Sequence, residues 1–131
     1  MKRIIPALLI TLSMTACQEV ERIDLSSLSP QEREAVTALS WLQEADAVRD
    51  AQQAIASGDK RLLAMASRAP SIPGVPEESR ERVETLCGLR YVEGSTDAVL
   101  GDVHLRLLQA AQEYAREYNQ LVLDACLKQA Q

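Results

Sequence analysis

The stretch Asp102–Cys126, DVHLRLLQAAQEYAREYNQLVLDAC, decides the fold of this chain. Its apolar residues recur at intervals of three and four, and they fall within about 140° of a helical wheel drawn at 100° per residue. The pattern predicts an amphipathic helix of roughly 25 residues whose apolar face is covered by the rest of the chain. That face comprises Val103, Leu107, Leu108, Ala111, Tyr114, Ala115, Tyr118, Leu121, Val122, Ala125 and Cys126.

A second helix is predicted upstream of this stretch. Residues 29–32, Ser-Pro-Gln-Glu, have the form of a capping box with proline at the first helical position, where a missing N–H costs nothing. The helix is expected to run to about Ser57, where Gly58 offers a left-handed stop. Its expected apolar face comprises Ala38, Trp41, Ala45, Val48, Gln52 and Ile55, with Leu42 at the edge.

The segment between these helices contains shorter elements. Asp59 can cap a short helix through Leu62, Leu63, Met65 and Ala66, which must end before Pro70. Residues 69–76 form a proline-rich loop, and a further helix is expected from Pro76 to Gly88, burying Val83 and Leu86 and exposing Glu81 and Glu84. Residues 89–96 are the least helical stretch, in which Tyr91-Val92 suits an extended pair but is too short to argue for a sheet. The expected fold class is all-α, a small bundle of about four helices.

The N-terminus has the layout of an export signal. Lys2 and Arg3 precede an apolar stretch over residues 4–12, and small residues follow before Cys17. The apolar stretch is too short to cross a bilayer, which takes about 20 apolar residues in helical form. Residues 14–17, Met-Thr-Ala-Cys, resemble the bacterial lipobox, although Met14 replaces the usual leucine.

The lipobox resemblance implies cleavage before Cys17 and attachment of diacylglycerol to its sulfur, often with a further acyl chain on the new amino group. Two or more acyl chains give stable membrane anchoring. The resemblance divides the chain into a signal peptide at 1–16, a lipidated tether at 17–28 and a helical domain at 29–131. Gln18, in place of aspartate, implies sorting to the outer membrane with the domain facing the periplasm. The alternative is an ordinary cleaved signal peptide followed by a chance cysteine.

With Cys17 assigned to lipid, Cys87 and Cys126 remain in an oxidising compartment. We expect them to form the one disulfide of the bundle, which closes a loop of about 40 residues and stabilises the fold by roughly 4 kcal/mol. The rival interpretation is a reactive thiol or half of a metal site.

Charge and composition exclude several partners. The formal net charge is −5 and becomes about two units more negative once Lys2 and Arg3 are removed. An acidic chain without a basic cluster lacks the electrostatic footprint of a nucleic-acid-binding protein. The five glycines are scattered, so no phosphate-binding loop is present in the sequence, and no cofactor or small-molecule substrate is expected.

Catalytic and metal-binding residues are not expected either. His104 is the only histidine, and a dyad with Cys87 would need a free thiol. The sequence lacks the short cysteine and histidine spacings that are typical of zinc sites. The carboxylates at positions 77, 78, 81 and 84 alternate with arginines, a pattern that is typical of a solvated helix face. The sequence therefore favours a protein that is not an enzyme, in which His104 is a boundary histidine that is hydrogen-bonded near the start of a helix.

One set of residues is a candidate partner groove. Tyr114 and Tyr118 stand one helical turn apart and either line a groove for a partner peptide or pack into the core. Leu105, Leu123 and Leu127 lie outside the main apolar face, where they are either exposed to a partner or covered by the first helix.

In layout, the tethered helical domain resembles the small helical pilotin lipoproteins, which escort secretion-channel subunits to the outer membrane. The resemblance is of architecture only, since no motif residue is matched. It implies a binding or assembly factor for another envelope protein. The alternative function is an inhibitor, immunity or exclusion lipoprotein that acts on an incoming enzyme or transfer system, for which the acidity would suit a basic target.

Overall fold

The computed structural model describes residues 23–67 and 70–129. The predicted fold class is confirmed, since this part of the chain is mostly helical, with four α-helices, three short 3₁₀ helices and one disulfide. It also contains a pair of three-residue strands, which was not predicted. The elements in chain order are η1 Leu25–Ser27, α2 Pro30–Ala38, η2 Ser40–Glu44, α3 Ala47–Ala56, β1 Leu62–Ala64, η3 Glu77–Ser79, α4 Arg80–Cys87, β2 Leu89–Tyr91 and α5 Asp102–Gln129.

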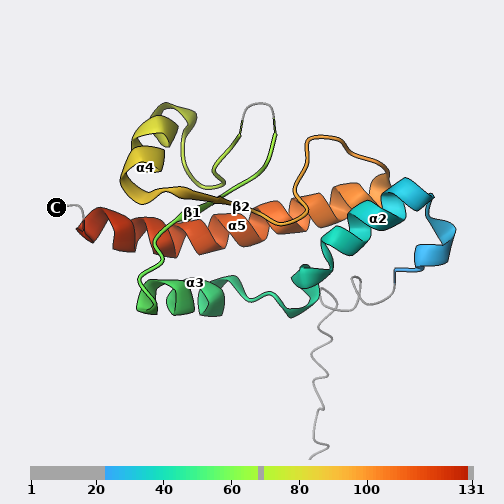
Figure 1. Ribbon diagram of the computed structural model, residues 1–131, viewed down its shortest axis with the longest axis horizontal. Coiled ribbons are helices and arrows are strands. Elements are labelled where there is room, and N and C mark those ends of the chain that lie inside the picture. The colour runs from blue at the N-terminus through green and yellow to red at the C-terminus, as the bar shows by residue number, and fades with distance from the viewer. Residues whose placement is uncertain (1–22, 68–69, 130–131) are drawn as a thin grey trace, which may run out of the picture.

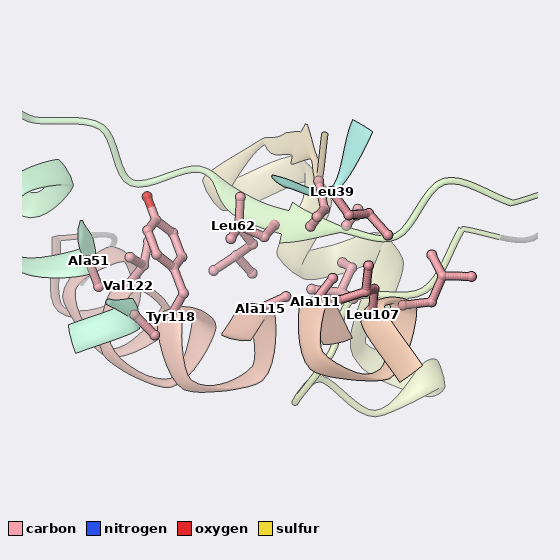
Figure 2. Packing of buried hydrophobic residues seen from close by; sticks show 14 of the residues in the cluster. Leu39, Ala51, Leu62, Leu107, Ala111, Ala115, Tyr118 and Val122 are labelled. Carbon is pink, nitrogen blue, oxygen red and sulfur yellow. The ribbon is translucent and has the colours of Figure 1, made fainter. Parts of the chain in front are cut away.

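The long helix α5 is the central element of the fold. It runs along most of the molecule, with α2 crossing its first turns, α3 along one side, α4 on the opposite side, and the two short strands lying across it (Figure 1). Leu39, Ala51 of α3 and Leu62 of β1 lie around its apolar stripe (Figure 2). Ala51, Ala111 and Ala115 are fully buried, and such small side chains let α3 and α5 pack closely. The predicted stripe is confirmed at its centre by the buried Leu107, Leu108, Ala111, Ala115, Tyr118, Val122 and Cys126, whereas Leu121 is exposed.

The predicted start of the first helix is confirmed, but its continuity is wrong. Ser29 Oγ accepts a hydrogen bond from the Glu32 N–H at 3.2 Å, and Pro30 opens α2 as expected. The helix ends at Ala38, and after η2 the chain is extended at Ala45 and Asp46. Asp46 then caps α3, because its side chain accepts a hydrogen bond from the Arg49 N–H at 3.0 Å. An aspartate that caps a new helix favours an interruption over a continuous helix.

The interruption changes which residues of this region are buried. The core contains Val36, Leu39, Ala47 and Ala51, and Val48 from the predicted face is 45% exposed. The predicted face was therefore wrong at the exposed Ala38, Val48 and Gln52, because its periodicity assumed an unbroken helix. It is confirmed at Trp41, Leu42 and Ile55, which are partly buried against the core. The predicted stop is confirmed, since α3 ends at Ala56 and Gly58 has φ +85°.

The predicted short helix over residues 59–66 is wrong, since Leu62–Ala64 is strand β1. It pairs in parallel with β2, with Leu62 opposite Leu89 and Ala64 opposite Tyr91. All three residues of β1 are buried. A short apolar run carries no periodicity that separates a buried strand from a buried helix, and burial on both faces suits a strand of a parallel pair.

The predicted helix between Pro76 and Gly88 is confirmed as η3 followed by α4, which ends at Gly88 with φ +79°. Val83 is buried as expected, but Leu86 is 45% exposed, so that part of the prediction was wrong. The disulfide between Cys87 and Cys126 is also confirmed, with 5.9 Å between the Cα atoms. It clamps the end of α4 to the last turns of α5.

Residues 1–22, and with them the expected signal peptide and Cys17, lie outside the described residues. The segment expected as a tether is shorter than residues 17–28, because Ile23 and Leu28 pack against the core. Between them, the Asp24 side chain caps η1 by accepting a hydrogen bond from the Ser26 N–H at 3.0 Å. Among the helices of residues 23–67 and 70–129, none combines the length and apolar character needed to cross a bilayer.

Candidate functional site

The five residues of the predicted partner groove do not form one surface. Tyr118 is 2% exposed and belongs to the core, and Leu123 packs against it. Leu105 and Leu127 are exposed but lie near opposite ends of α5, about 33 Å apart along the helix axis at 1.5 Å per residue. A candidate binding surface therefore has to be sought from the packing of neighbouring elements.

The two tyrosines belong to an aromatic cluster with Trp41 of η2. The ring centroids of Trp41 and Tyr114 lie 5.0 Å apart in an edge-on arrangement, and those of Tyr114 and Tyr118 lie 6.1 Å apart. The Trp41 Nε1–H donates to the carbonyl of Glu93 at 2.8 Å, and the Arg90 guanidinium lies 5.8 Å from the Tyr118 ring centroid. The cluster thus joins η2, α5 and the segment around β2 and holds Tyr118 in the core.

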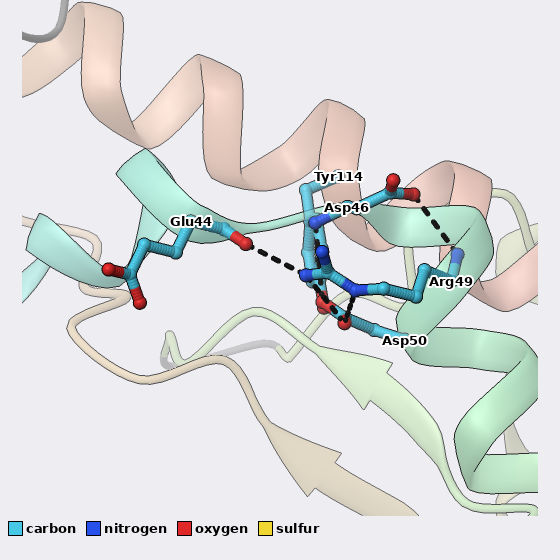
Figure 3. A network of polar contacts seen from close by, with 5 residues as sticks. All are labelled: Glu44, Asp46, Arg49, Asp50 and Tyr114. Carbon is cyan, nitrogen blue, oxygen red and sulfur yellow. Dashed lines mark hydrogen bonds and ion pairs between the residues drawn. The ribbon is translucent and has the colours of Figure 1, made fainter.

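Tyr114 also belongs to a polar network that joins α3 to α5 (Figure 3). Its hydroxyl donates to Asp50 Oδ2 at 2.7 Å. The Arg49 guanidinium donates to Asp50 Oδ1 at 3.2 and 3.3 Å and to the Glu44 carbonyl at 2.8 Å. The Asp46 N–H donates to Asp50 Oδ2 at 3.4 Å. Both carboxylate oxygens of Asp50 therefore accept hydrogen bonds from within the fold.

This network shifts two pKa values in opposite directions. Partial burial acts to raise the pKa of Asp50, but the hydrogen bonds from Tyr114, Asp46 and Arg49 outweigh burial and hold the pKa below its usual value. Burial, and after it the hydrogen bond to Asp50, raises the pKa of Tyr114 well above the usual 10.0. The pair therefore stays as carboxylate and neutral phenol near neutral pH, which makes it a structural link between α3 and α5.

His104 lies in the first turn of α5 and is fully buried. Its Nδ1 accepts a hydrogen bond from the Leu100 N–H at 3.1 Å, and its backbone N–H donates to Glu32 Oε1 at 3.3 Å. Within the described part of the chain, Nε2 has no hydrogen-bond partner. Because Cys87 is in the disulfide, a dyad between the two residues is excluded.

Glu32 has a role that sequence reasoning missed. Its carboxylate is nearly buried and lies against Gly101 and the His104 N–H, at the positive end of the α5 dipole. The sequence predicted Glu32 only as part of the capping box of its own helix. No local signal identifies this contact, since the two residues are 72 positions apart.

Asn119 is a second buried polar residue that the sequence did not single out. Its Oδ1 accepts a hydrogen bond from the Leu63 N–H at 2.7 Å, and its Nδ2 donates to the carbonyls of Leu63 and Pro73, each at 2.9 Å. The sequence does contain a signal for the burial of Asn119. Position 119 follows Ala115 by four residues and precedes Val122 by three, which places the asparagine on the apolar stripe.

The two-stranded sheet has one closed edge and one open edge. The Leu62 N–H donates to the Gly88 carbonyl at 3.0 Å, and the Val92 N–H donates to the Ala64 carbonyl at 2.9 Å. In a parallel ladder with this register, the N–H and C=O of Arg90 also face β1, and those of Leu89 and Tyr91 face away from it. Within residues 23–67 and 70–129, no other strand pairs with β2 on that side.

The surface of the described domain includes a smaller and a larger hollow. The smaller one, of about 170 Å³, is mainly apolar and opens where η1 meets α2 and α5. The larger one, of about 550 Å³, is shallow and lies beside the disulfide at the start of both strands. Its lining residues are Gly58, Asp59, Lys60, Arg61, Leu86, Cys87, Cys126 and Gln129.

In the described ranges, no three histidine, cysteine, aspartate or glutamate side chains lie close enough together to hold a metal ion. The open side of β2 and the larger hollow near its start are two neighbouring exposed features of the described domain. Compared with known proteins, the chain matches no family, no curated protein and no solved structure.

Proposed function

We propose that this chain is a lipoprotein anchored to the outer membrane through Cys17, whose periplasm-facing domain is a non-catalytic binding or assembly factor for another envelope protein. The disulfide is the observation that carries the proposal. Of three cysteines, Cys87 and Cys126 pair with each other, so Cys17 is the only cysteine outside the disulfide. A structural disulfide fits an exported protein, and the remaining cysteine stands directly after a signal-like segment.

The point at which the folded domain begins limits how far it reaches from the membrane. Ile23 already packs against the core, so the five residues 18–22 separate lipidated Cys17 from the domain. The six residue steps from Cys17 to Ile23 span about 20 Å when fully extended. The tether therefore holds the start of the domain within about 20 Å of the lipid anchor, which favours a partner that is also associated with the membrane.

A binding role also fits how the polar residues are used. Asn119, Asp50 and Tyr114 each make their hydrogen bonds within the domain, where they join elements of the fold. The layout of a short tether and a small disulfide-clamped helical domain supports an adaptor that holds a segment of another protein. The inhibitor or exclusion function stays the alternative, supported by the acidity of the chain.

The test uses the full chain with a C-terminal tag, expressed in its own host and compared with Cys17→Ser. We expect wild-type protein in the outer-membrane fraction, carrying a specific envelope protein after crosslinking and detergent extraction. Cys17→Ser should leave that fraction. Recovery of no partner would contradict the binding role, and recovery of an incoming enzyme or a transfer-system component would favour the alternative.

A further inference from the structure

The strand β2 has an unsatisfied outer side. In the described part of the chain, the outward N–H groups of Leu89 and Tyr91 donate no hydrogen bond to another element, and their C=O groups accept none. Tyr91 is 54% exposed, Arg90 is also exposed and Leu89 is partly exposed, so the strand lies at the surface of the described domain. A row of unpaired backbone groups is a template for another strand.

The opposite side of the sheet shows that the fold does not leave both edges open. The outward N–H and C=O of Leu63 on β1 are both bonded by the Asn119 side chain, at 2.7 and 2.9 Å. The side chain of an asparagine therefore takes the place of a third strand at β1. Only the β2 side of the sheet is available for pairing.

The spacing of the free groups specifies the occupant. Leu89 and Tyr91 are two residues apart along a strand, so their outward groups are separated by about 6.6 Å. An extended peptide backbone presents its alternating N–H and C=O groups at the same interval, whereas a helix does not. The occupant is therefore an extended peptide segment.

The surroundings of β2 provide contacts for the side chains of such a segment. Exposed Tyr91 lies at one end of the strand. At the other end, the hollow of about 550 Å³ begins beside Gly88, where Arg61 lies close to the glycine and half-exposed Leu86 forms part of the lining. The hollow therefore lies near the start of β2, where a segment longer than the strand could make further contacts.

A second copy of the chain fits this edge less well than a peptide of another protein. The edge is only three residues long, and edge-to-edge pairing alone would bury far less than the roughly 1,000 Å² typical of a stable interface. Two copies also carry a net negative charge each, which opposes association. An extended tail can instead add contacts in the hollow beyond the edge.

We propose that the outer side of β2 binds an extended segment of the envelope partner by strand addition, with Leu89 and Tyr91 supplying the backbone hydrogen bonds. This inference rests on the proposed binding function and names its site and mode.

A proline at position 91 tests the inference directly. Tyr91→Pro removes an outward N–H while leaving the Arg90 and Val92 groups that face β1, and proline is tolerated on the open side of an edge strand. Tyr91→Ala is the matched control, because it removes the same side chain and keeps the N–H. With tagged full-length protein in native envelopes, Tyr91→Pro should lower partner recovery at least tenfold, whereas Tyr91→Ala should lower it less than threefold.

A second measurement does not depend on the folding of the proline variant. The photocrosslinker p-benzoylphenylalanine at position 91 of the full chain should capture the partner, and mass spectrometry should locate the crosslinked segment. That segment, synthesised as a peptide and added to wild-type protein, should slow amide hydrogen exchange at Leu89 and Tyr91, because both amides face the added strand. Arg90 and Val92, already bonded to β1, should change little.

The outcomes separate the two proposals. Equal recovery by both variants, unchanged exchange at Leu89 and Tyr91, or crosslinking only to a second copy of the chain would overturn strand addition while the binding function stands. Failure of wild-type protein to recover any envelope protein would overturn both.

Discussion

The side chain of Asn119 on α5 forms hydrogen bonds with both outward backbone groups of Leu63 on β1. The Leu63 N–H donates to Asn119 Oδ1 at 2.7 Å, and Asn119 Nδ2 donates to the Leu63 carbonyl at 2.9 Å. The same amide also bonds the Pro73 carbonyl, and the Asn119 side chain is 1% exposed. One side chain therefore fixes both the strand and the proline-rich loop against the central helix.

Replacing Asn119 with alanine should strongly destabilise the domain. The change leaves an N–H and two carbonyls without their partner in the core, and each such group costs about 1 to 3 kcal/mol. We expect a loss of about 3 kcal/mol or more in the free energy of unfolding, measured by urea denaturation with the disulfide intact. Gln120→Ala, an exposed change on the same helix, should cost less than about 0.5 kcal/mol. A loss below about 1 kcal/mol for Asn119→Ala would contradict the role of this amide.

Two glycines with similar backbone angles should respond differently to alanine. Gly94 has φ +79°, and an added Cβ would lie 2.7 Å from the Ala38 carbonyl oxygen. Gly58 has φ +85° with no atom within 4 Å of that position. Gly58→Ala should cost about 1 kcal/mol for the backbone angle alone. Gly94→Ala should cost clearly more, because backbone atoms must move, and equal thermal midpoints for the two variants would contradict this packing.

Removing the disulfide should cost a large share of the stability. The bond joins residues 39 positions apart, for which the loop-entropy estimate is about 4 kcal/mol. The double variant Cys87→Ser with Cys126→Ser should show this loss in chemical denaturation. The wild-type domain treated with reductant is the matched comparison and should lose a similar amount. Stability unchanged in both samples would show that the bridge does not restrain the unfolded chain.

The pair of Tyr114 and Asp50 should give stability a pH dependence at both ends of the range. Since the pKa of Asp50 is lowered in the folded protein, its contribution is present above the usual value of 3.8 and is lost as pH falls through the folded pKa. Since the pKa of Tyr114 is raised above 10.0, its contribution is present below pH 10 and is lost as pH rises beyond it.

Tyr114→Phe removes the shared hydrogen bond, which is worth about 1 to 2 kcal/mol for a charged acceptor that is partly exposed. The difference in unfolding free energy between wild type and Tyr114→Phe should be largest between about pH 5 and 9 and should shrink toward both extremes. The exposed Tyr91→Phe serves as a control and should show no such profile. A difference that stays constant from pH 3 to 11 would contradict the coupling.

The elements that the sequence predicted are those defined by local patterns. The α5 stripe repeats over seven turns, and the caps at Ser29 and Gly58 and the stop at Gly88 depend on residues close to them in the chain. The same holds for the disulfide, which followed from the count of cysteines and the expected compartment. Such signals need no knowledge of tertiary contacts.

The features that the sequence did not predict depend on distant contacts. Leu62–Ala64 is a strand because Leu89–Tyr91 lies beside it, and no property of three apolar residues specifies that pairing. The break between α2 and α3 does have a local signal, because Asp46 is a typical helix-capping residue. The apolar periodicity across the break resembles that of one continuous helix and hides this signal. The residues of the predicted groove do not form one surface. A helical wheel shows only the direction of each side chain around the axis, whereas Leu105 and Leu127 lie far apart along the axis.

The most direct test of the account is mass spectrometry of the N-terminal peptide of the mature protein, purified from membranes. We predict that the chain begins at Cys17 and that this residue carries a diacylglycerol, with a further acyl chain on its amino group. An unmodified Cys17, or a chain that retains residues 1–16 and is found in the cytosol, would contradict the proposed anchor, its compartment and the membrane-proximal binding function.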